Sequence, residues 1–220
     1  MKCLYCNEET SSRLNIRSLL LMTEEEARLC SMCQESFQFI SDCHCLMCYK
    51  EGVSEICDDC KEWEKLEKQI SHEAIYQYDQ SMKLFFSRYK FFGDYVLAKA
   101  FAQDVRRLLL PYKEWTLVPI PVSQETYAER CFNQVSALLE AAHLPYQELL
   151  LKQASQKQSS KTRQERLCTK QVFQVKNHVV LPQKVLLFDD IYTTGATLRL
   201  ACMALEKQGV KEIRTASLAR

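Results

Sequence analysis

Glycine is scarce in this sequence: only four occur among 220 residues, and none of them precedes a lysine. A Walker phosphate loop needs a glycine directly before its lysine, and the dinucleotide fingerprint needs three closely spaced glycines. The nucleophile elbow of serine hydrolases needs a glycine on each side of its serine. All three motifs are therefore excluded.

Histidines at helical spacing and long apolar runs are also lacking. The four histidines never stand four residues apart, which excludes the HExxH metalloprotease helix. The longest uncharged apolar runs, such as residues 185–188, are far shorter than the roughly 20 residues that cross a bilayer, so no transmembrane segment is predicted. Residues 1–3 lead straight into cysteine-rich sequence without a charged-then-apolar leader, so we expect a cytoplasmic protein.

Charge and cysteine are present but unevenly distributed. Residues 1–70 carry 8 Lys and Arg against 14 Asp and Glu, whereas residues 71–220 carry 21 against 14. Nine of the twelve cysteines precede residue 61. This division predicts two domains: a small cysteine-rich zinc-binding domain with its connector at 1–70, and a larger domain at 71–220.

Beyond residue 70, apolar runs alternate with amphipathic stretches. Strands are predicted at 74–78, 116–120, 184–188 and 213–218, helices at about 124–142 and 197–208, and apolar or amphipathic stretches at 83–89 and 95–110. This alternation favours an α/β fold with a largely parallel sheet flanked by helices. A short helix is predicted around 23–29, a polar, helix-favouring connector at 58–70, and a mobile loop over the carboxyl edge of the sheet at 153–171.

Eight cysteines form four Cys-x2-Cys pairs. Each such turn aims both sulfurs at one point, so two turns can complete a tetrahedral zinc shell. Pairing in chain order predicts two sites, although the sequence also allows the first and third pairs to join. Separately, Cys43 and His44 lie beside the second set and are alternative ligands for it, with Cys43 more simply explained as a spare surface thiol. Four thiolates leave no open position, so one or two structural Zn2+ ions are predicted. The predicted ligands are Cys3, Cys6, Cys30, Cys33, Cys45, Cys48, Cys57 and Cys60.

The most specific segment is VLLFDDIYTTGAT at residues 185–197. A buried strand runs into two acids, then into a hydroxyl-rich loop, and then into a helix. Backbone N–H groups at a helix amino terminus can bind a dianionic phosphate without a lysine, and carboxylates can accept hydrogen bonds from ribose hydroxyls. The predicted ribose-binding residues are Asp189 and Asp190, and the predicted phosphate loop consists of Thr193, Thr194, Gly195, Ala196 and Thr197.

This segment resembles the type I phosphoribosyltransferase signature. The resemblance implies that the acids contact the ribose of phosphoribosyl pyrophosphate, that the loop holds its 5-phosphate, and that Mg2+ bridges its ribose and pyrophosphate. The cysteine pairs, RYKFFG at 88–93, VPIP at 118–121, RCFNQ at 130–134 and Gln158 with Arg163 and Arg166 extend the match. Together they resemble the ComF family of competence proteins over essentially the whole chain.

The ComF resemblance implies a role and a set of partners. It implies an accessory protein for uptake of single-stranded DNA in natural transformation, which binds a phosphoribosyl ligand, single-stranded DNA and the competence DNA helicase ComFA. Recruitment to the inner face of the membrane uptake machinery through these partners is also implied. Arg130 would lie on the pyrophosphate side. The family usually has glycine where this chain has Cys131.

Basic residues near aromatic residues are the remaining signal. Cations follow phosphates and aromatic faces stack on bases, so this mixture suits single-stranded nucleic acid. Phe85, Phe86 and Phe92 are nevertheless expected in the core, and the basic residues of the loop could serve pyrophosphate instead. The candidate nucleic-acid contacts are Arg88, Lys90, Lys161, Arg163 and Arg166.

Two other functions stay open at this point. One is an active phosphoribosyltransferase that acts on an unidentified nitrogenous acceptor, and the other is a regulatory or protein-binding scaffold. The remaining thiols, Cys131, Cys168 and Cys202, lack partners for thiol catalysis and are expected to be buried or spare. No role is assigned to the three histidines beyond residue 70.

Overall fold

The computed structural model describes residues 2–9, 29–66, 70–153 and 172–220. The helix predicted around 23–29 and the mobile loop predicted at 153–171 lie almost entirely outside these residues. Five residues singled out above also lie outside them: Gln158, Lys161, Arg163, Arg166 and Cys168.

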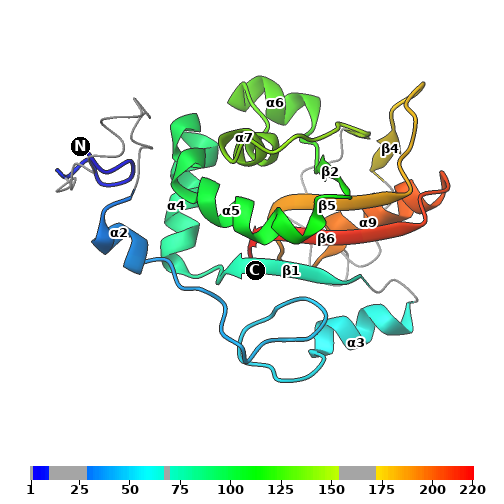
Figure 1. Cartoon of the computed structure of the whole chain (residues 1–220), viewed down its shortest axis with the longest axis horizontal. Coiled ribbons are helices and arrows are strands. Elements are labelled where there is room, and N and C mark those ends of the chain that lie inside the picture. Colours follow the sequence, from blue (N-terminus) through cyan, green and yellow to red (C-terminus); the bar gives the residue numbers. More distant parts are fainter. Residues whose placement is uncertain (1, 10–28, 67–69, 154–171) are drawn as a thin grey trace.

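Four parallel strands form the central sheet, in the order β1-β6-β5-β2 (Figure 1). β5 lies between β2 and β6 and is buried along most of its length, as its unbroken apolar run predicts. The α/β class with a largely parallel sheet is therefore confirmed. The strands are β1 (His72–Tyr76), β2 (Thr116–Pro119), β5 (Lys184–Ile191) and β6 (Glu212–Ala219).

Side chains of β5 alternate between two hydrophobic cores, one on each face of the sheet. Leu186 and Phe188 enter the first core, together with residues of four helical segments, whereas Val185 and Leu187 enter the second core with residues of α9. The helical segments of the first core are α4 (Gln80–Phe91), η1 (Tyr95–Phe101), α5 (Ala102–Leu109) and α7 (Gln134–Ala141), and α9 spans Ala196–Glu206. A short 3-10 turn, η2 (Leu110–Tyr112), leads from α5 towards β2.

The helix predicted at 124–142 is wrong as a single helix, because the chain breaks it into α6 (Gln124–Arg130) and α7. Cys131 adopts the left-handed conformation, with φ 63°, and ends α6. Asn133 then begins α7, since its side chain accepts a hydrogen bond from the Val135 N–H at 2.9 Å. Hydrophobic periodicity continued across this break and concealed it.

A small antiparallel sheet, which the sequence pattern did not predict, joins β3 (Leu150–Lys152) to β4 (Phe173–Val175). Strands of three residues are too short to show a clear alternation. The Gln153 N–H donates to the Val172 carbonyl at 2.9 Å. Gln153 and Val172 therefore lie side by side, next to the paired strands β3 and β4.

The cysteine-rich part packs into both cores. Its described residues include the helices α2 (Ser31–Glu35) and α3 (Asp58–Lys65), and α3 confirms the helical tendency predicted for the connector. Phe37 lies in the first core, and four cysteines lie in the second: Cys45, Cys48, Cys57 and Cys60. The boundary predicted near residue 70 stays a prediction, although the side chains on its two sides share these cores. Within the described ranges, no helix has the length and apolarity that a bilayer crossing requires.

Candidate functional site

The two predicted ribose-binding acids lie at the carboxyl end of β5, and both are buried. The Asp190 N–H donates to Asp189 Oδ1, and the Ile191 N–H donates to Asp190 Oδ1, each at 2.9 Å. These bonds hold each carboxyl group close to the backbone of the following residue. The acid pair is thus ordered by its own strand before any ligand arrives.

Lys90 of α4 is the cation that faces this pair, because its ammonium forms an ion pair with Asp190 Oδ2. Burial is the largest influence on the pKa of Asp190 and would raise it, but the Lys90 ammonium together with hydrogen bonds from Asp189 and the Ile191 N–H lowers that pKa. Burial and the neighbouring Asp190 charge raise the pKa of Asp189 well above its ordinary value. Among the residues that the structure describes, the two carboxyl groups thus share one close ammonium, and they differ in their tendency to hold a proton.

The predicted phosphate loop follows directly and opens α9. Gly195 has φ 77°, and a Cβ placed on it would lie 1.9 Å from Arg199 Nη1 and 2.2 Å from the Tyr192 hydroxyl. No side chain fits there, which explains why this position holds one of the few glycines. Thr193 is exposed, whereas Thr194, Ala196 and Thr197 are partly buried. The loop therefore presents backbone and hydroxyl groups at the amino terminus of α9.

The RCFNQ segment supports the same edge of the sheet. Arg130 Nη1 donates to Gln134 Oε1 at 2.9 Å, and the Arg130 guanidinium lies 5.5 Å from the ring centre of Phe91. Asn133 Nδ2 donates to the Ile120 carbonyl at 3.1 Å, which ties the start of α7 to the chain beyond β2. The predicted role of Arg130 on the pyrophosphate side stays a prediction.

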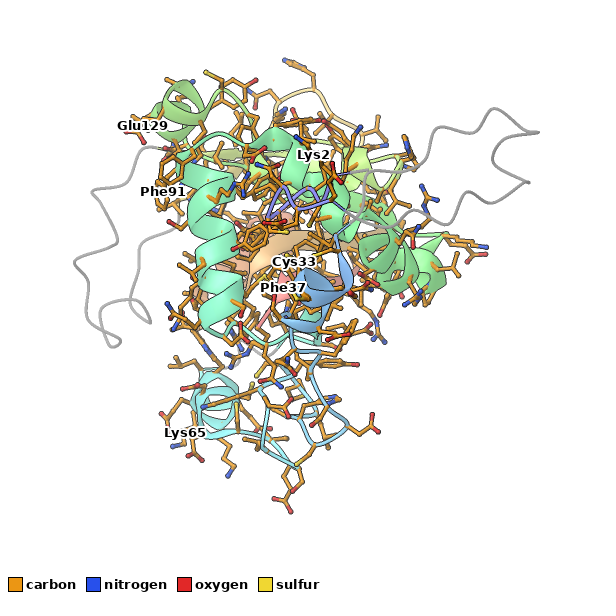
Figure 2. All side chains as sticks on the ribbon, turned by 90° about the vertical axis from the view of Figure 1, so that its left-hand side faces the viewer. Lys2, Cys33, Phe37, Lys65, Phe91 and Glu129 are labelled. Carbon is orange, nitrogen blue, oxygen red and sulfur yellow. The ribbon has the colours of Figure 1, made fainter. Side chains whose placement is uncertain are left out.

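Arg88 and the aromatic residues of α4 divide between the interior and the surface. Arg88 forms an ion pair with Asp94 at 2.9 Å and donates to the Tyr5 carbonyl. The core prediction is confirmed for Phe85 and Phe86 and wrong for Phe92, which is 81% exposed. Phe92 follows the last residue of α4, where the chain turns away from the core at Gly93, φ 67°. Phe91 is 75% exposed, and Figure 2 shows it at the end of α4.

The eight predicted zinc ligands form two groups, Cys3–Cys6–Cys30–Cys33 and Cys45–Cys48–Cys57–Cys60, which we call the first and second cysteine groups. Within each group the sulfurs lie within 4.8 Å of one another. A tetrahedron of sulfurs at about 2.3 Å from a zinc ion has edges of about 3.8 Å. The Sγ–Sγ distances of 3.7 Å (Cys6–Cys30), 3.6 Å (Cys48–Cys57) and 4.0 Å (Cys45–Cys60) fit that tetrahedron.

The sulfurs group in chain order, which is one of the two pairings that the sequence left open. Both groups are built in the same way. In each, a Cys-x2-Cys turn ends at a residue with positive φ, Asn7 in the first group and Tyr49 in the second. In each, the other pair begins a helix with a cysteine at its N-cap, Cys30 for α2 and Cys57 for α3. The alternative ligands Cys43 and His44 lie outside both groups.

The two groups differ in their surroundings. The second is entirely buried, whereas Cys6 of the first is exposed. Arg220 Nη2 donates to Cys48 Sγ at 3.3 Å, and hydrogen bonding from Cys60 together with the Arg220 charge lowers the pKa of Cys48 to about 4, while the same hydrogen bond raises the pKa of Cys60. A thiolate is the form that ligates zinc. The residues present therefore fit a structural metal in both groups, most completely in the second.

Sequence reasoning missed two residues that contact the loop, Trp63 and Arg199. Trp63 Nε1 donates to the Thr194 carbonyl at 2.9 Å across 131 residues, and Arg199 Nη1 donates to the same oxygen at 3.2 Å. Trp63 lies within the stretch 58–70, which the sequence predicts only as a polar connector. An arginine in the first turn of a helix is no signal by itself, so neither contact could be read from local pattern.

A parallel sheet whose central strand ends in an acid pair and a glycine-closed loop is the arrangement expected of a phosphoribosyltransferase-like domain. Residues 95–220 match the phosphoribosyl transferase domain family. The chain is 46% identical to "Competence protein ComFC" of Streptococcus pneumoniae over 220 residues, which cover the whole of both proteins. It is 34% identical to "Competence protein ComFC" of Bacillus subtilis over 94% of this chain and 89% of that protein. "Competence protein F" of Haemophilus influenzae is 26% identical over 87% of this chain and 90% of that protein. The chain therefore belongs to the ComFC family of competence proteins and carries a phosphoribosyl transferase domain.

Proposed function

We propose that this chain is an accessory protein for uptake of single-stranded DNA in natural transformation, and that it binds phosphoribosyl pyrophosphate or a related phosphoribosyl ligand. The observation that carries the ligand proposal is the unbroken order of β5, the acid pair, the loop at 193–197 and α9. In this order the hydrogen-bond acceptors for ribose hydroxyls stand next to the N–H groups for a 5-phosphate.

Charge supports the same ligand. The acid pair has one close ammonium for two carboxyl groups, so ribose hydroxyls and a bridging cation would be favourable neighbours. Mg2+ would enter with the pyrophosphate and neutralise part of its charge. Arg130 would stand on the pyrophosphate side, presented by its bond to Gln134.

Calorimetric titration tests the ligand site. Phosphoribosyl pyrophosphate with Mg2+ should bind the wild-type protein, and the double variant Asp189→Asn, Asp190→Asn should lose that binding while keeping its circular dichroism spectrum. Asp58→Asn is the matched control, because the Asp58 side chain is exposed on α3. Unchanged binding by the double variant would refute the site.

A single-stranded DNA surface is proposed at the end of α4. Phe91 and Phe92 offer two exposed rings, and the Arg130 guanidinium lies against the first of them. Stacking of a base on such a ring contributes about 1 to 3 kcal/mol. Arg88 and Lys90 border these rings in sequence. The Arg88–Asp94 ion pair is partly exposed, so a DNA phosphate can compete with Asp94 for the guanidinium, whereas Lys90 is paired with the buried Asp190.

The DNA proposal is tested with a fluorescent oligonucleotide. Phe91→Ala with Phe92→Ala should weaken binding at least tenfold, which corresponds to the loss of about one stacked base. Leu84→Ala removes an exposed apolar side chain from the same helix and should change nothing. Replacing Lys161, Arg163 and Arg166 with glutamine should reduce the salt dependence. Equal affinity of wild type and the double phenylalanine variant would count against the surface.

The partner proposed for the acidic part is the competence DNA helicase. Exposed acids on and before α3 include Glu55, Asp58 and Glu62. A basic patch on the helicase would be attracted to such a face. Glu55→Lys with Glu62→Lys should reduce co-purification of the helicase, whereas Glu212→Lys on β6 should not. Retained co-purification with the first variant would refute this surface.

An active phosphoribosyltransferase is the second candidate, and the family match over residues 95–220 favours it. In such a transfer the bond from the anomeric carbon to pyrophosphate breaks and a bond to a nitrogen of the acceptor forms. Release of pyrophosphate in the presence of candidate acceptors or DNA distinguishes this enzyme from a protein that only binds the ligand. Acceptor-dependent release that Asp189→Asn abolishes would establish it.

A further inference from the structure

The Thr194 carbonyl accepts hydrogen bonds from two buried side chains, which lie on the interior side of the loop. Trp63 donates to it at 2.9 Å and Arg199 at 3.2 Å. A trans peptide is planar, so the Thr194 C=O and the Gly195 N–H point in opposite directions. Holding the carbonyl towards the interior therefore turns the Gly195 N–H outwards, to the side on which a phosphate would lie.

Arg199 fills the space beneath the loop. Its guanidinium lies 4.2 Å from the ring centre of Trp63, and Nη1 also donates to the Tyr192 hydroxyl at 2.8 Å. Through one side chain, these contacts join Tyr192, which directly precedes the loop, to Thr194 within it. Its positive charge is buried under a loop to which the proposed function assigns a dianionic phosphate.

Trp63 and Tyr192, the two aromatic residues beside Arg199, are each connected to the second cysteine group. Trp63 follows Cys60 by three residues on α3, and the two share the buried side of that helix. Arg220 Nε donates to the Cys48 carbonyl at 3.2 Å, and its guanidinium lies 4.8 Å from the ring centre of Tyr192. The loop is therefore linked to the cysteine group indirectly by two routes, one through Trp63 and one through Arg220 and Tyr192.

We propose that Trp63 and Arg199 are positioning residues for the phosphate site, and that the second cysteine group controls the affinity of that site through Trp63 and Arg220. The proposal rests on the proposed function, in which this loop binds the 5-phosphate. The second group would hold Zn2+, which keeps α3 and Cys48 in place. When the group is empty, α3 can shift and the Thr194 carbonyl loses the hydrogen bond from Trp63.

Binding of two separate probes tests the positioning role. Trp63→Phe keeps an aromatic ring and removes the N–H donor, and Arg199→Met removes the second donor and the charge. Each should weaken ribose 5-phosphate about tenfold, as the loss of one buried hydrogen bond implies. Binding of pyrophosphate with Mg2+ should be unchanged, which a general loss of structure would not permit. Trp115→Phe, at the only other tryptophan, is the matched control and should bind like wild type.

The cysteine arm uses Trp63 as a reporter in the Trp115→Phe background. Removal of Zn2+ from the second group should shift the Trp63 emission and weaken ribose 5-phosphate, and added Zn2+ should restore both. Cys6→Ser, in the first group, should leave both readouts unchanged. If wild-type protein binds neither ribose 5-phosphate nor phosphoribosyl pyrophosphate, the proposed function itself fails. If wild type binds and Trp63→Phe and Arg199→Met bind equally well, only the present inference is overturned.

Discussion

Arg199 occupies the space in which a side chain at residue 195 would begin, since a Cβ on Gly195 would lie 1.9 Å from Arg199 Nη1. Gly195→Ala should therefore lower the free energy of unfolding by about 2 kcal/mol, because the methyl group displaces a buried guanidinium and φ is positive. Urea unfolding measures this loss. Ribose 5-phosphate binding should fall more than tenfold.

Gly209→Ala is the control for that experiment. Gly209 also has positive φ, but a Cβ there meets nothing within 4 Å. Gly209→Ala should lower the free energy of unfolding by only about 1 kcal/mol, because the positive φ is unfavourable for alanine, and it should leave ligand binding unchanged. Equal losses at the two positions would contradict the steric explanation.

Lys90 is predicted to stabilise the fold in a pH-dependent manner. Lys90→Met leaves the buried acid pair without its ion-pair partner, which should cost about 3 kcal/mol at pH 7. The folded-state pKa of Asp190 is lowered in wild type, so this contribution is present above its ordinary pKa and is lost as pH falls through the folded value.

The pH profile separates this explanation from a loss of packing. In the variant Asp190 takes up a proton more readily, so the difference from wild type should shrink as pH falls from 7 towards 4. Unfolding curves at several pH values measure it. Lys83→Met, at an exposed position of the same helix, should differ little from wild type at any pH. A difference independent of pH would refute the electrostatic assignment.

Cys131 is a non-glycine residue with φ 63° at the end of α6. Cys131→Gly should raise the free energy of unfolding by about 1 kcal/mol, because glycine adopts the left-handed conformation without a Cβ clash. Thermal and urea unfolding measure the gain. Cys131→Ala removes the sulfur and keeps the strain, so it should not stabilise. An alanine variant as stable as the glycine variant would contradict the backbone explanation.

The two cysteine groups should lose metal in two phases. Purified protein should contain two Zn2+ per chain, and a thiol-reactive reagent should release one rapidly and one slowly. The rapid phase belongs to the first group, since Cys6 is exposed, and the slow phase to the wholly buried second group. A colorimetric zinc indicator follows both. Cys6→Ser should abolish the rapid phase alone, whereas a single phase in wild type would contradict the assignment.

Local signals in the sequence predicted the central features of this protein. The candidate ligand segment is continuous along the chain: it consists of β5, its acid pair, the loop and α9. Its apolar run, its turn residues and the start of its helix could therefore be recognised together. The eight clustered cysteines could be predicted for the same reason, because each Cys-x2-Cys pair is a local turn. Two expectations were wrong. The hydrophobic periodicity continues across Cys131, where α6 in fact ends, and Phe92 was expected in the core although the chain turns outwards there.

The sequence by itself thus determined the fold class, the candidate ligand segment and the cysteine ligands, because each depends on residues a few positions apart. Only the tertiary structure decided which pairs form each cysteine group, that Lys90 faces Asp190, and that Trp63 holds the Thr194 carbonyl. These relationships join residues up to 131 positions apart. They follow from how helices pack on both faces of the sheet, and no local pattern records that packing.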